Sequence, residues 1–287
     1  MLKRLFGKTG FEISPVVYAG IVSMSDGQKK SDEYVAYACD KGINYFDVAP
    51  SYGDAQEKLG NSLKPYRNNV YLACKTAERT ATRAKKEMSD SFKMLHTDHF
   101  DVYQMHALST MEDLDVAFGK EGIMNLLIQA KQEGLIRNIS FTAHNEAVAI
   151  KALSLYDFAS VMFPINWGMN LGKGFGSQLS EIIRNKGIGL LGMKTLIHRA
   201  WLDDKEKNAS RFPKSWCKPI TDNEKLGIAA LKYTLSLGAN AVVPPGNFEH
   251  FSFAVEHITQ CLENPINEAD IAYLKEELIK IDGHYFF

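Results

Sequence analysis

Four polar residues with complementary acid–base chemistry stand at or just after the ends of short apolar segments. Asp47 ends one segment, Tyr52 follows it in the next loop, and Lys75 and His106 end the next two. A free tyrosine has a pKa of about 10, which is too high for an efficient proton donor at neutral pH. A neighbouring ammonium favours the phenolate, so we expect Lys75 to lower the pKa of Tyr52. Asp47 would hold Lys75 charged by an ion pair, and His106 would orient a substrate oxygen by a hydrogen bond.

Together these groups predict proton transfer to a carbonyl oxygen, with Tyr52 as the general acid. Each residue taken singly has a plainer interpretation, because a Lys or Asp at a strand end is usually leaving the core for water. The coincidence of an acid, a phenol, an amine and an imidazole at matching positions favours a reactive site. These groups supply a proton but no electrons, so a reducing cofactor must bring the hydride.

The elements that would position these residues form a repeating pattern of apolar runs and amphipathic helical segments. The runs are rich in Val, Ile and Leu with little alternation, which is typical of parallel strands covered on both faces. Eight strands are predicted, at residues 15–20, 43–48, 70–75, 100–106, 136–142, 160–165, 188–193 and 241–243. Eight strand–helix units without a linker predict an α/β fold, a (β/α)8 TIM barrel made by residues 1–287 as one domain, with an open doubly wound sheet as the alternative. In the barrel the carboxyl ends of the strands converge, so the four residues would meet at one mouth.

Two further elements flank the barrel strands. Residues 3–6 and 11–14 predict a short N-terminal hairpin. Apolar residues spaced by three and four positions over 271–281, behind Asn267, predict a C-terminal helix with Asn267 as its N-cap. The connection 194–221 after the seventh strand is unusually long, which is typical of a functional or mobile loop.

Composition and charge exclude several classes of partner. The chain has 287 residues, with 33 Lys and Arg against 34 Asp and Glu and a formal net charge of −1, and no block of one sign is long. This balance argues against a nucleic-acid partner or an anionic membrane surface, and no apolar run reaches the roughly 18 residues of a membrane span. The first residues lack the apolar core of a signal peptide, and the four cysteines are scattered without a C-x-x-C pair. We therefore expect a cytoplasmic location, no metal site and a small molecule as the partner.

Several segments resemble the aldo-keto reductase superfamily, and the resemblance extends over nearly the whole chain. They include Asn-Tyr-Phe-Asp-Val-Ala-Pro-Ser-Tyr-Gly at 44–53, Ala-Cys-Lys-Thr at 73–76 and Asp-Val-Tyr-Gln-Met-His at 101–106. The resemblance implies a (β/α)8 barrel that reversibly reduces aldehydes or ketones with NADP(H) or NAD(H), NADP(H) being favoured. It also implies a catalytic tetrad, here called the tetrad, in which Tyr52 is the acid: Asp47, Tyr52, Lys75 and His106.

The same resemblance implies a set of cofactor contacts at the carboxyl ends of the strands: Gly20, Ile21, Asp47, Thr142, Met193, Lys194, Gly246 and Asn247. Several of these positions depart from the family pattern. After the fifth strand only the hydroxyl of Thr142 remains of the family's Ser-Asn pair, and at the end of the seventh strand Met193 replaces an aromatic residue. Met-Lys-Thr at 193–195 resembles a branch whose longer members carry a ferredoxin-like tail. The cysteine cluster of that tail is absent from this chain, so we expect no iron–sulfur centre.

The stretch 244–251 after the eighth strand is poor in the basic residues that the family presents to the adenosine 2′-phosphate, and the family's Arg falls on Phe251. An adenosine phosphate needs charge-assisted donors. The candidate replacements lie in the long connection: Lys194, His198, Arg199 and Lys205. The alternatives are a preference for NAD(H) and weak cofactor binding.

Two other functions remain open. Lys75 or Lys194 could attack a carbonyl as the amine of a Schiff-base lyase, although Asp47 would keep Lys75 protonated. The chain could also be a non-catalytic or regulatory binding module, which the altered cofactor positions favour and the intact tetrad disfavours. The candidate walls of a substrate pocket are three tryptophans, Trp167, Trp201 and Trp216.

Overall fold

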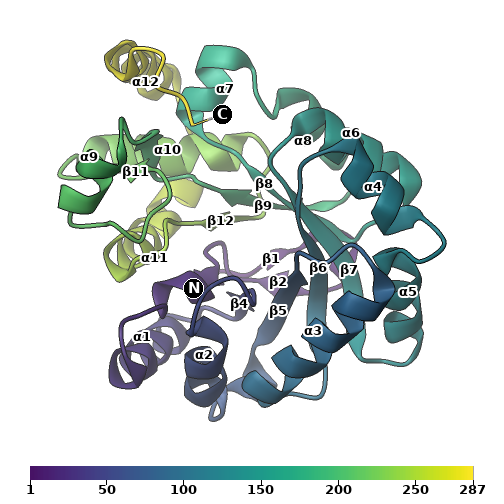
Figure 1. Ribbon diagram of the computed structural model, residues 1–287. Helices are drawn as coiled ribbons and strands as arrows, with labels where there is room; N and C mark the ends of the chain where they lie inside the picture. The colour runs from purple at the N-terminus through teal and green to yellow at the C-terminus, as the bar shows by residue number, and fades with distance from the viewer. Residues whose placement is uncertain (287) are drawn as a thin grey trace.

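The computed structural model describes residues 1–286, and at its centre lies a sheet of eight parallel strands (Figure 1). In chain order they are β3 (Tyr18–Ala19), β4 (Tyr45–Asp47), β5 (Tyr71–Thr76), β6 (Phe100–Leu108), β7 (Ile136–Ala143), β8 (Ser160–Pro164), β9 (Gly189–Met193) and β12 (Ala241–Val243). Each strand pairs with the next of these eight along the chain. The sheet closes where Val16 bridges Val242 and where the Val17 N–H donates to the Val242 carbonyl over 3.0 Å. The predicted (β/α)8 barrel is confirmed, and the open doubly wound sheet is excluded.

Helices surround the barrel, and most follow a strand directly. They are α1 (Gln28–Asp40), α2 (Ala55–Leu63), α3 (Ala81–Met94), α4 (Met111–Phe118), α5 (Ile123–Gln132), α6 (Glu146–Leu155), α7 (Trp167–Lys173), α8 (Ser177–Lys186), α9 (Asp204–Ala209), α10 (Glu224–Ser236), α11 (Phe248–Glu263) and α12 (Glu268–Ile281). Asparagine side chains accept hydrogen bonds from first-turn N–H groups of several helices, which is why those helices begin where they do. The C-terminal helix predicted behind Asn267 is α12, where Asn267 and Asp270 form a capping box.

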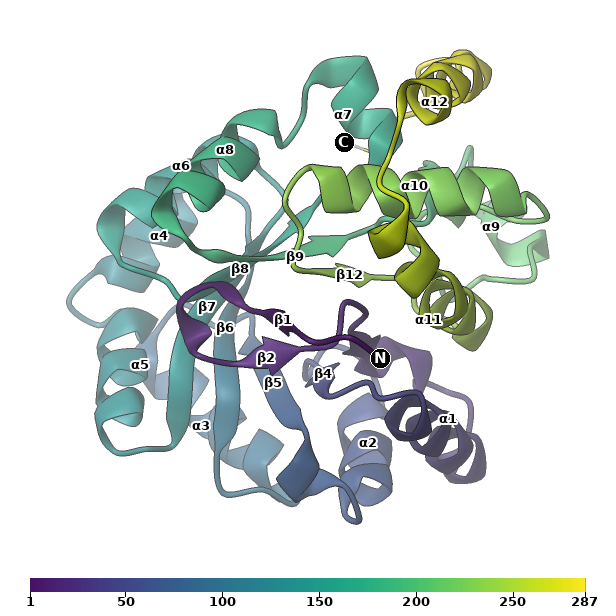
Figure 2. The same cartoon turned by 180° about the vertical axis from the view of Figure 1, so that it is seen from behind.

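The predicted N-terminal hairpin is formed by β1 (Arg4–Leu5) and β2 (Glu12–Ile13). Figure 2 shows it lying across the barrel strands, on the side opposite to the view of Figure 1. Gly7, between the two strands, has a φ of +49° and approaches the barrel so closely that a Cβ there would lie 1.9 Å from the backbone nitrogen of Gly189. The Phe6 ring also packs on Gly189, at the start of β9. The hairpin therefore covers the amino-terminal end of the barrel and leaves ligands the carboxyl end.

The strand bounds differ from the predicted ones where the backbone turns. The predicted strand 15–20 shortens to β3: Gly20 begins a 3-10 helix, η2 (Gly20–Val22), and Val16 makes only an isolated bridge with Val242. The strand predicted at 100–106 extends to Leu108, because its register with β7 shifts between Met105 and Leu108 and Ala107 adopts a left-handed φ of +54°.

The long connection 194–221 is an ordered subdomain of the rim. It contains the antiparallel strands β10 (Ile197–Arg199) and β11 (Lys218–Pro219), with α9 between them. Arg199 and Lys218 each contact the carboxylate of Glu206 at 2.6 Å, which ties the helix to both strands. The connection 194–221, expected to be a functional or mobile loop, therefore has secondary structure of its own.

Candidate active site

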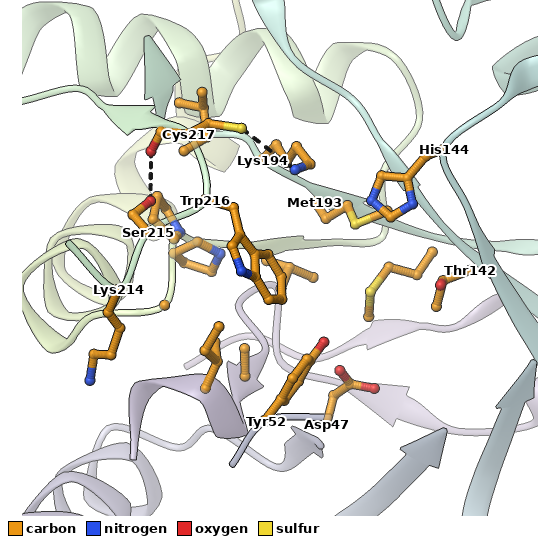
Figure 3. Close-up of a pocket in the computed structure, with 18 of the residues that line it drawn as sticks. Asp47, Tyr52, Thr142, His144, Met193, Lys194, Lys214, Ser215, Trp216 and Cys217 are labelled. Carbon is orange, nitrogen blue, oxygen red and sulfur yellow. Dashed lines mark hydrogen bonds between the residues drawn. The ribbon is translucent and has the colours of Figure 1, made fainter. Parts of the chain in front are cut away.

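The tetrad converges at the carboxyl ends of three neighbouring strands. The register of β4 with β5 pairs Asp47 with Ala73, and that of β5 with β6 pairs Lys75 with Gln104. The polar ends of the three strands therefore lie side by side. All four tetrad side chains line one cavity, called here the tetrad cavity, and Figure 3 labels Asp47 and Tyr52 in it.

A buried ion pair forms the floor of this cavity. The ammonium of Lys75 contacts the Asp47 carboxylate, and both side chains are almost completely buried. Burial lowers the pKa of Lys75, but the charges of Asp47 and Tyr52 outweigh that effect and raise it above its ordinary value. The amide of Gln104 donates to Asp47 Oδ1 at 2.5 Å and holds the carboxylate from the neighbouring strand. Sequence reasoning missed Gln104, although its place two residues before His106 on one strand puts both side chains on the same face.

Tyr52 is buried, with 7% of its surface exposed, and Lys75 Nζ lies 5.0 Å from the centroid of its ring. Burial raises the pKa of Tyr52, and the positive charge of Lys75 opposes that rise without cancelling it. The expectation that Lys75 brings this pKa below its ordinary value is therefore wrong for the cavity as it stands. The physical reason is that removing a phenolate from water costs more free energy than its attraction to one neighbouring ammonium recovers.

The His106 ring lies edge-on to Tyr52, with 6.0 Å between ring centroids. Burial lowers the pKa of His106 to about 3, and the charge of Lys75 adds to the effect, so the imidazole is neutral at physiological pH. The hydroxyl of Thr142 accepts a hydrogen bond from the Ala107 N–H at 2.7 Å. This bond holds the bulged end of β6 and thereby the position of His106.

Most of the residues expected to contact a cofactor also line the tetrad cavity: Ile21, Asp47, Thr142, Met193, Lys194 and Gly246. Gly20 lies beside Ile21, against Val48, and Asn247 follows Gly246 at the N-cap of α11. Neither of these two residues lines the tetrad cavity itself.

His144 is a cavity residue that sequence reasoning missed. It follows β7 directly, and burial together with the charge of Lys194 lowers its pKa to about 4. A polar residue just beyond a barrel strand is the same signal that singled out the tetrad, so His144 could have been found by it.

The connection 194–221 covers one side of the cavity with Trp216, whose ring lies 5.9 Å from that of Tyr52 (Figure 3). Trp216 is 59% exposed, whereas Trp167 is fully buried and lines no part of the cavity. Trp201 lies in a separate cavity that shares Trp216 and Cys217 with the first. Of the three tryptophans proposed as walls, Trp167 is thus a core residue, because its side chain is fully buried and lines no part of the cavity.

Lys214 fastens this connection to the opposite side of the mouth. Its ammonium donates to the carbonyl oxygens of Val22 and Met24, each at 3.0 Å, and to the carboxylate of Asp26 at 2.9 Å. These partners follow β3, so one side chain joins segments that are far apart in the sequence. Nothing in the local pattern around Lys214 indicates this contact.

We expect Lys214→Ala to loosen the connection without unfolding the barrel. Charge-assisted hydrogen bonds each contribute about 1.5–3 kcal/mol, so the segment should open at least about tenfold more often. Limited proteolysis with chymotrypsin should then cleave near Phe212 and Trp216 correspondingly faster. Lys205→Ala, an exposed position on the same connection, is the control, and equal cleavage of both variants would contradict the role of Lys214.

Two further features of the described chain bear on other classes of function. Within residues 1–286, no group of three or more His, Cys, Asp or Glu side chains is placed to hold a metal ion. None of the helices in this part of the chain has both the length and the apolar character needed to traverse a bilayer.

Comparisons with known proteins agree with the fold and show the family. Aldo-keto reductase YhdN of Bacillus subtilis (strain 168) is 36% identical over 117 residues, which cover 34% of this chain and 35% of the relative. L-galactose dehydrogenase of Arabidopsis thaliana is 30% identical over 159 residues, or 48% of this chain and 47% of the relative, so both matches span less than half of these relatives. The structure of aldo-keto reductase AKR11C1 from Bacillus halodurans, in its holo form, superposes with a TM-score of 0.74 over 96% of each chain at 19% identity. The model of the aldo/keto reductase family matches residues 22–276, and the chain belongs to that family.

Proposed function

We propose that this chain is a nicotinamide-dependent oxidoreductase that interconverts an aldehyde or ketone with its alcohol, with Tyr52 as the general acid. Aldo-keto reductases generally carry out this class of reaction. The observation that carries the proposal is the buried Tyr52 phenol beside a buried ammonium–carboxylate pair in one cavity. The test is to mix the purified chain with NADH or NADPH and a panel of aldehydes and ketones, and to follow the absorbance of the reduced nicotinamide. Failure of the whole panel to consume either cofactor would contradict the proposal.

The residues at the carboxyl end of the barrel fit a nicotinamide dinucleotide. Bound there, the nicotinamide supplies the hydride that the protein's own groups lack. Ile21 and Met193 would flank the nicotinamide ring, whereas Lys194, Gly246 and Asn247 would hold the phosphates. The fit is supported by the buried Asn247 amide, whose Nδ2 has no hydrogen-bond partner within residues 1–286. It stands at the start of the sixteen-residue helix α11, and a helix N-terminus favours anions.

The protein's own groups hold one proton and transfer it to or from the substrate oxygen. Tyr52 carries its proton at neutral pH, because burial raises the pKa of this phenol, and it donates that proton to the carbonyl oxygen as negative charge develops there. The ammonium of Lys75 stabilises the phenolate that remains, and Asp47 and Gln104 hold that ammonium in place. In alcohol oxidation the Tyr52 phenolate accepts the proton instead.

The neutral imidazole of His106 has a positioning task in this scheme. Its low pKa leaves one N–H donor and one acceptor nitrogen at every physiological pH. We propose that the N–H donates to the substrate carbonyl oxygen, which orients that oxygen toward the Tyr52 hydroxyl. A neutral donor also avoids placing another positive charge beside Lys75.

The exposed indole of Trp216 would contact the part of the substrate that extends beyond the carbonyl. We expect Trp216→Ala to raise the KM of carbonyl substrates that bear an aromatic ring about three- to tenfold, with a smaller change in kcat, because ring–ring contacts contribute about 0.5–1.5 kcal/mol. Steady-state kinetics with an aromatic aldehyde measure this effect. A short aliphatic aldehyde, too small to reach the indole, is the control, and an equal KM increase for both substrates would contradict the assignment.

The two other functions have less support. A Schiff-base lyase needs an uncharged amine, but Asp47 and Tyr52 outweigh the effect of burial and raise the pKa of Lys75. A non-catalytic module is the second candidate, because Thr142 and Met193 depart from the family pattern of cofactor contacts. Fluorescence titration with NADH and NADPH separates it from the enzyme, since it predicts that neither cofactor binds.

A further inference from the structure

The strand end that carries His106 departs from regular sheet geometry. The register of β6 with β5 ends at Met105, and its register with β7 passes from Met105 directly to Leu108. His106 and Ala107 therefore have no register partner on either neighbouring strand. Ala107 also has a φ of +54°, in the left-handed region that residues other than glycine rarely adopt. Such a backbone persists only where the surrounding groups hold it.

The side chain of Arg79, in the loop between β5 and α3, holds this strand end. Its Nη2 donates hydrogen bonds to the carbonyl oxygen of His106 at 2.7 Å and to that of Ala107 at 3.2 Å. The Ala107 N–H donates in turn to the Thr142 hydroxyl at 2.7 Å. Both peptide groups that flank Ala107 are thus fixed, and they set the direction in which the His106 side chain leaves the strand.

Arg79 is itself fixed by contacts of its other two guanidinium nitrogens. Nε contacts Asp113 Oδ1 at 3.1 Å, and Nη1 donates to the carbonyl oxygen of Ala77 at 2.9 Å. Asp113 also accepts the Ser109 N–H at 3.0 Å, so the same carboxylate reaches the chain just beyond β6. Only 14% of the Arg79 side chain is exposed. A planar guanidinium can serve all four acceptors at once, whereas the compact ammonium of a lysine cannot keep this arrangement.

Arg79 is connected to the site only through its neighbours. It lines no part of the tetrad cavity, whereas a carbonyl substrate must enter that cavity to reach Tyr52. The connection passes through His106, whose ring lines the cavity and lies edge-on to Tyr52. Hydrogen-bond donation depends steeply on distance and angle, and a misplacement of about 1 Å can cost about 10²-fold in rate. The bonds that Arg79 donates to the two carbonyl oxygens therefore bear on where the His106 N–H points.

We propose that Arg79 is a positioning residue for carbonyl reduction, and that it aims the His106 imidazole at the substrate oxygen by holding two carbonyl oxygens at the end of β6. This inference rests on the proposed function and adds to it a residue from the loop before α3. Asp113 belongs to the same hydrogen-bonded network, because it holds Nε of Arg79. Without the guanidinium, Ala107 is expected to relax toward a commoner backbone conformation, and His106 is expected to turn away from Tyr52.

The test compares Arg79→Lys with the matched control Arg67→Lys. Arg67 stands in the 3-10 helix η3 (Arg67–Asn69), and its side chain is 15% exposed. It too donates to two carbonyl oxygens, those of Val70 at 3.2 Å and His99 at 3.0 Å, but it lines no part of the tetrad cavity. We expect Arg79→Lys to lower kcat/KM for carbonyl reduction about ten- to hundredfold. Arg67→Lys should stay within about a factor of two, although a thermal melt should show comparable losses of stability in both variants.

A double-mutant cycle distinguishes the positioning of His106 from a general loss of structure. In the His106→Ala background, Arg79→Lys should change kcat/KM by less than about twofold, because no imidazole remains to be aimed. That background keeps Tyr52, so its residual rate can be measured at high enzyme concentration. Asp113→Asn is a milder change, since asparagine keeps an acceptor oxygen and loses only the charge. It should lower kcat/KM about threefold or more in the otherwise unmodified chain and not in the His106→Ala background.

Hydrogen–deuterium exchange provides a readout that needs no turnover. The Ala107 N–H donates to Thr142, and it should exchange at least about threefold faster in Arg79→Lys, because the strand end then opens more often. Arg67→Lys should leave this exchange unchanged.

The outcomes separate this inference from the proposed function. Unchanged kcat/KM in Arg79→Lys, or an equal loss with and without His106, overturns the inference while the oxidoreductase proposal stands. An equal loss in Arg67→Lys, or unchanged exchange of the Ala107 N–H in Arg79→Lys, also overturns it. If Arg79→Lys fails to fold, Asp113→Asn decides by the same criteria. Failure of the unmodified chain to reduce any carbonyl overturns the proposed function and this inference together.

Discussion

Replacing Tyr52 by Phe is expected to lower kcat for carbonyl reduction by about 10²–10⁴-fold, because general-acid catalysis contributes a factor of that size. The substitution removes the hydroxyl and leaves the ring, which packs beside His106 and Trp216. Cofactor binding and thermal stability should therefore change little. Steady-state kinetics, cofactor titration and a thermal melt measure the three quantities on the same preparation.

The matched control for this variant is Tyr45→Phe. Tyr45 is a fully buried tyrosine on the same strand as Asp47, its hydroxyl lacks a partner within residues 1–286, and it does not line the tetrad cavity. Removing that hydroxyl should leave kcat within a factor of about two of the unmodified protein, since no proton passes through it. If Tyr52→Phe kept a comparable kcat, Tyr52 would not be the acid, and the mechanism proposed above would fail.

Replacing Lys75 by Met is expected to produce the second large loss, again about 10²–10⁴-fold in kcat, together with a change in pH dependence. Without the ammonium, nothing of equal charge opposes the effect of burial, so the pKa of Tyr52 should rise further. In alcohol oxidation, which needs the Tyr52 phenolate, the rise of kcat/KM with pH should therefore move to more alkaline pH. A merely structural role for Lys75 would lower the rate without moving that profile.

The stability of the Lys75→Met variant carries a separate expectation. Leaving Asp47 buried without its partner should cost about 3–5 kcal/mol in the free energy of unfolding. The double variant Asp47→Asn/Lys75→Met should recover much of that loss, because neither residue is then charged, but it should recover none of the activity. Recovered activity in the double variant would contradict the role assigned to the ammonium.

The pH range of this stability effect follows from the direction of the shift. The folded-state pKa of Lys75 is raised above its ordinary value of 10.5. Its contribution to stability is therefore fully present below pH 10.5 and is lost only as pH rises through the folded-state value. Burial already raises the pKa of Asp47, and losing the ammonium should raise it further. The difference in unfolding free energy between the unmodified protein and Lys75→Met, measured by denaturant unfolding, should therefore shrink at lower pH, where the unpaired Asp47 binds a proton.

The local pattern of the sequence was sufficient to identify the barrel and to predict that the tetrad side chains meet at its mouth. Apolar runs without alternation mark strands covered on both faces, and each run ends where a polar residue can leave the core. Because parallel strands in a barrel present their carboxyl ends to one mouth, the ends of three neighbouring runs placed Asp47, Lys75 and His106 together. The helix behind Asn267 was equally local, since a capping residue and a spacing of three and four positions suffice to predict it.

Burial, pKa values and cavity shape depend on segments that are far apart in the sequence, and only the tertiary structure decided them. The pKa of Tyr52 depends on how much water the whole rim removes, and that effect exceeds the charge of Lys75. The contacts of Lys214 with the segment after β3 and the burial of Trp167 likewise depend on how remote segments pack. A second cavity brings residues that precede α10 next to residues of α11, and no sequence spacing relates the two. Strand ends are thus set by local periodicity, whereas desolvation, charge clustering and the shape of a cavity arise from every segment that meets at the mouth.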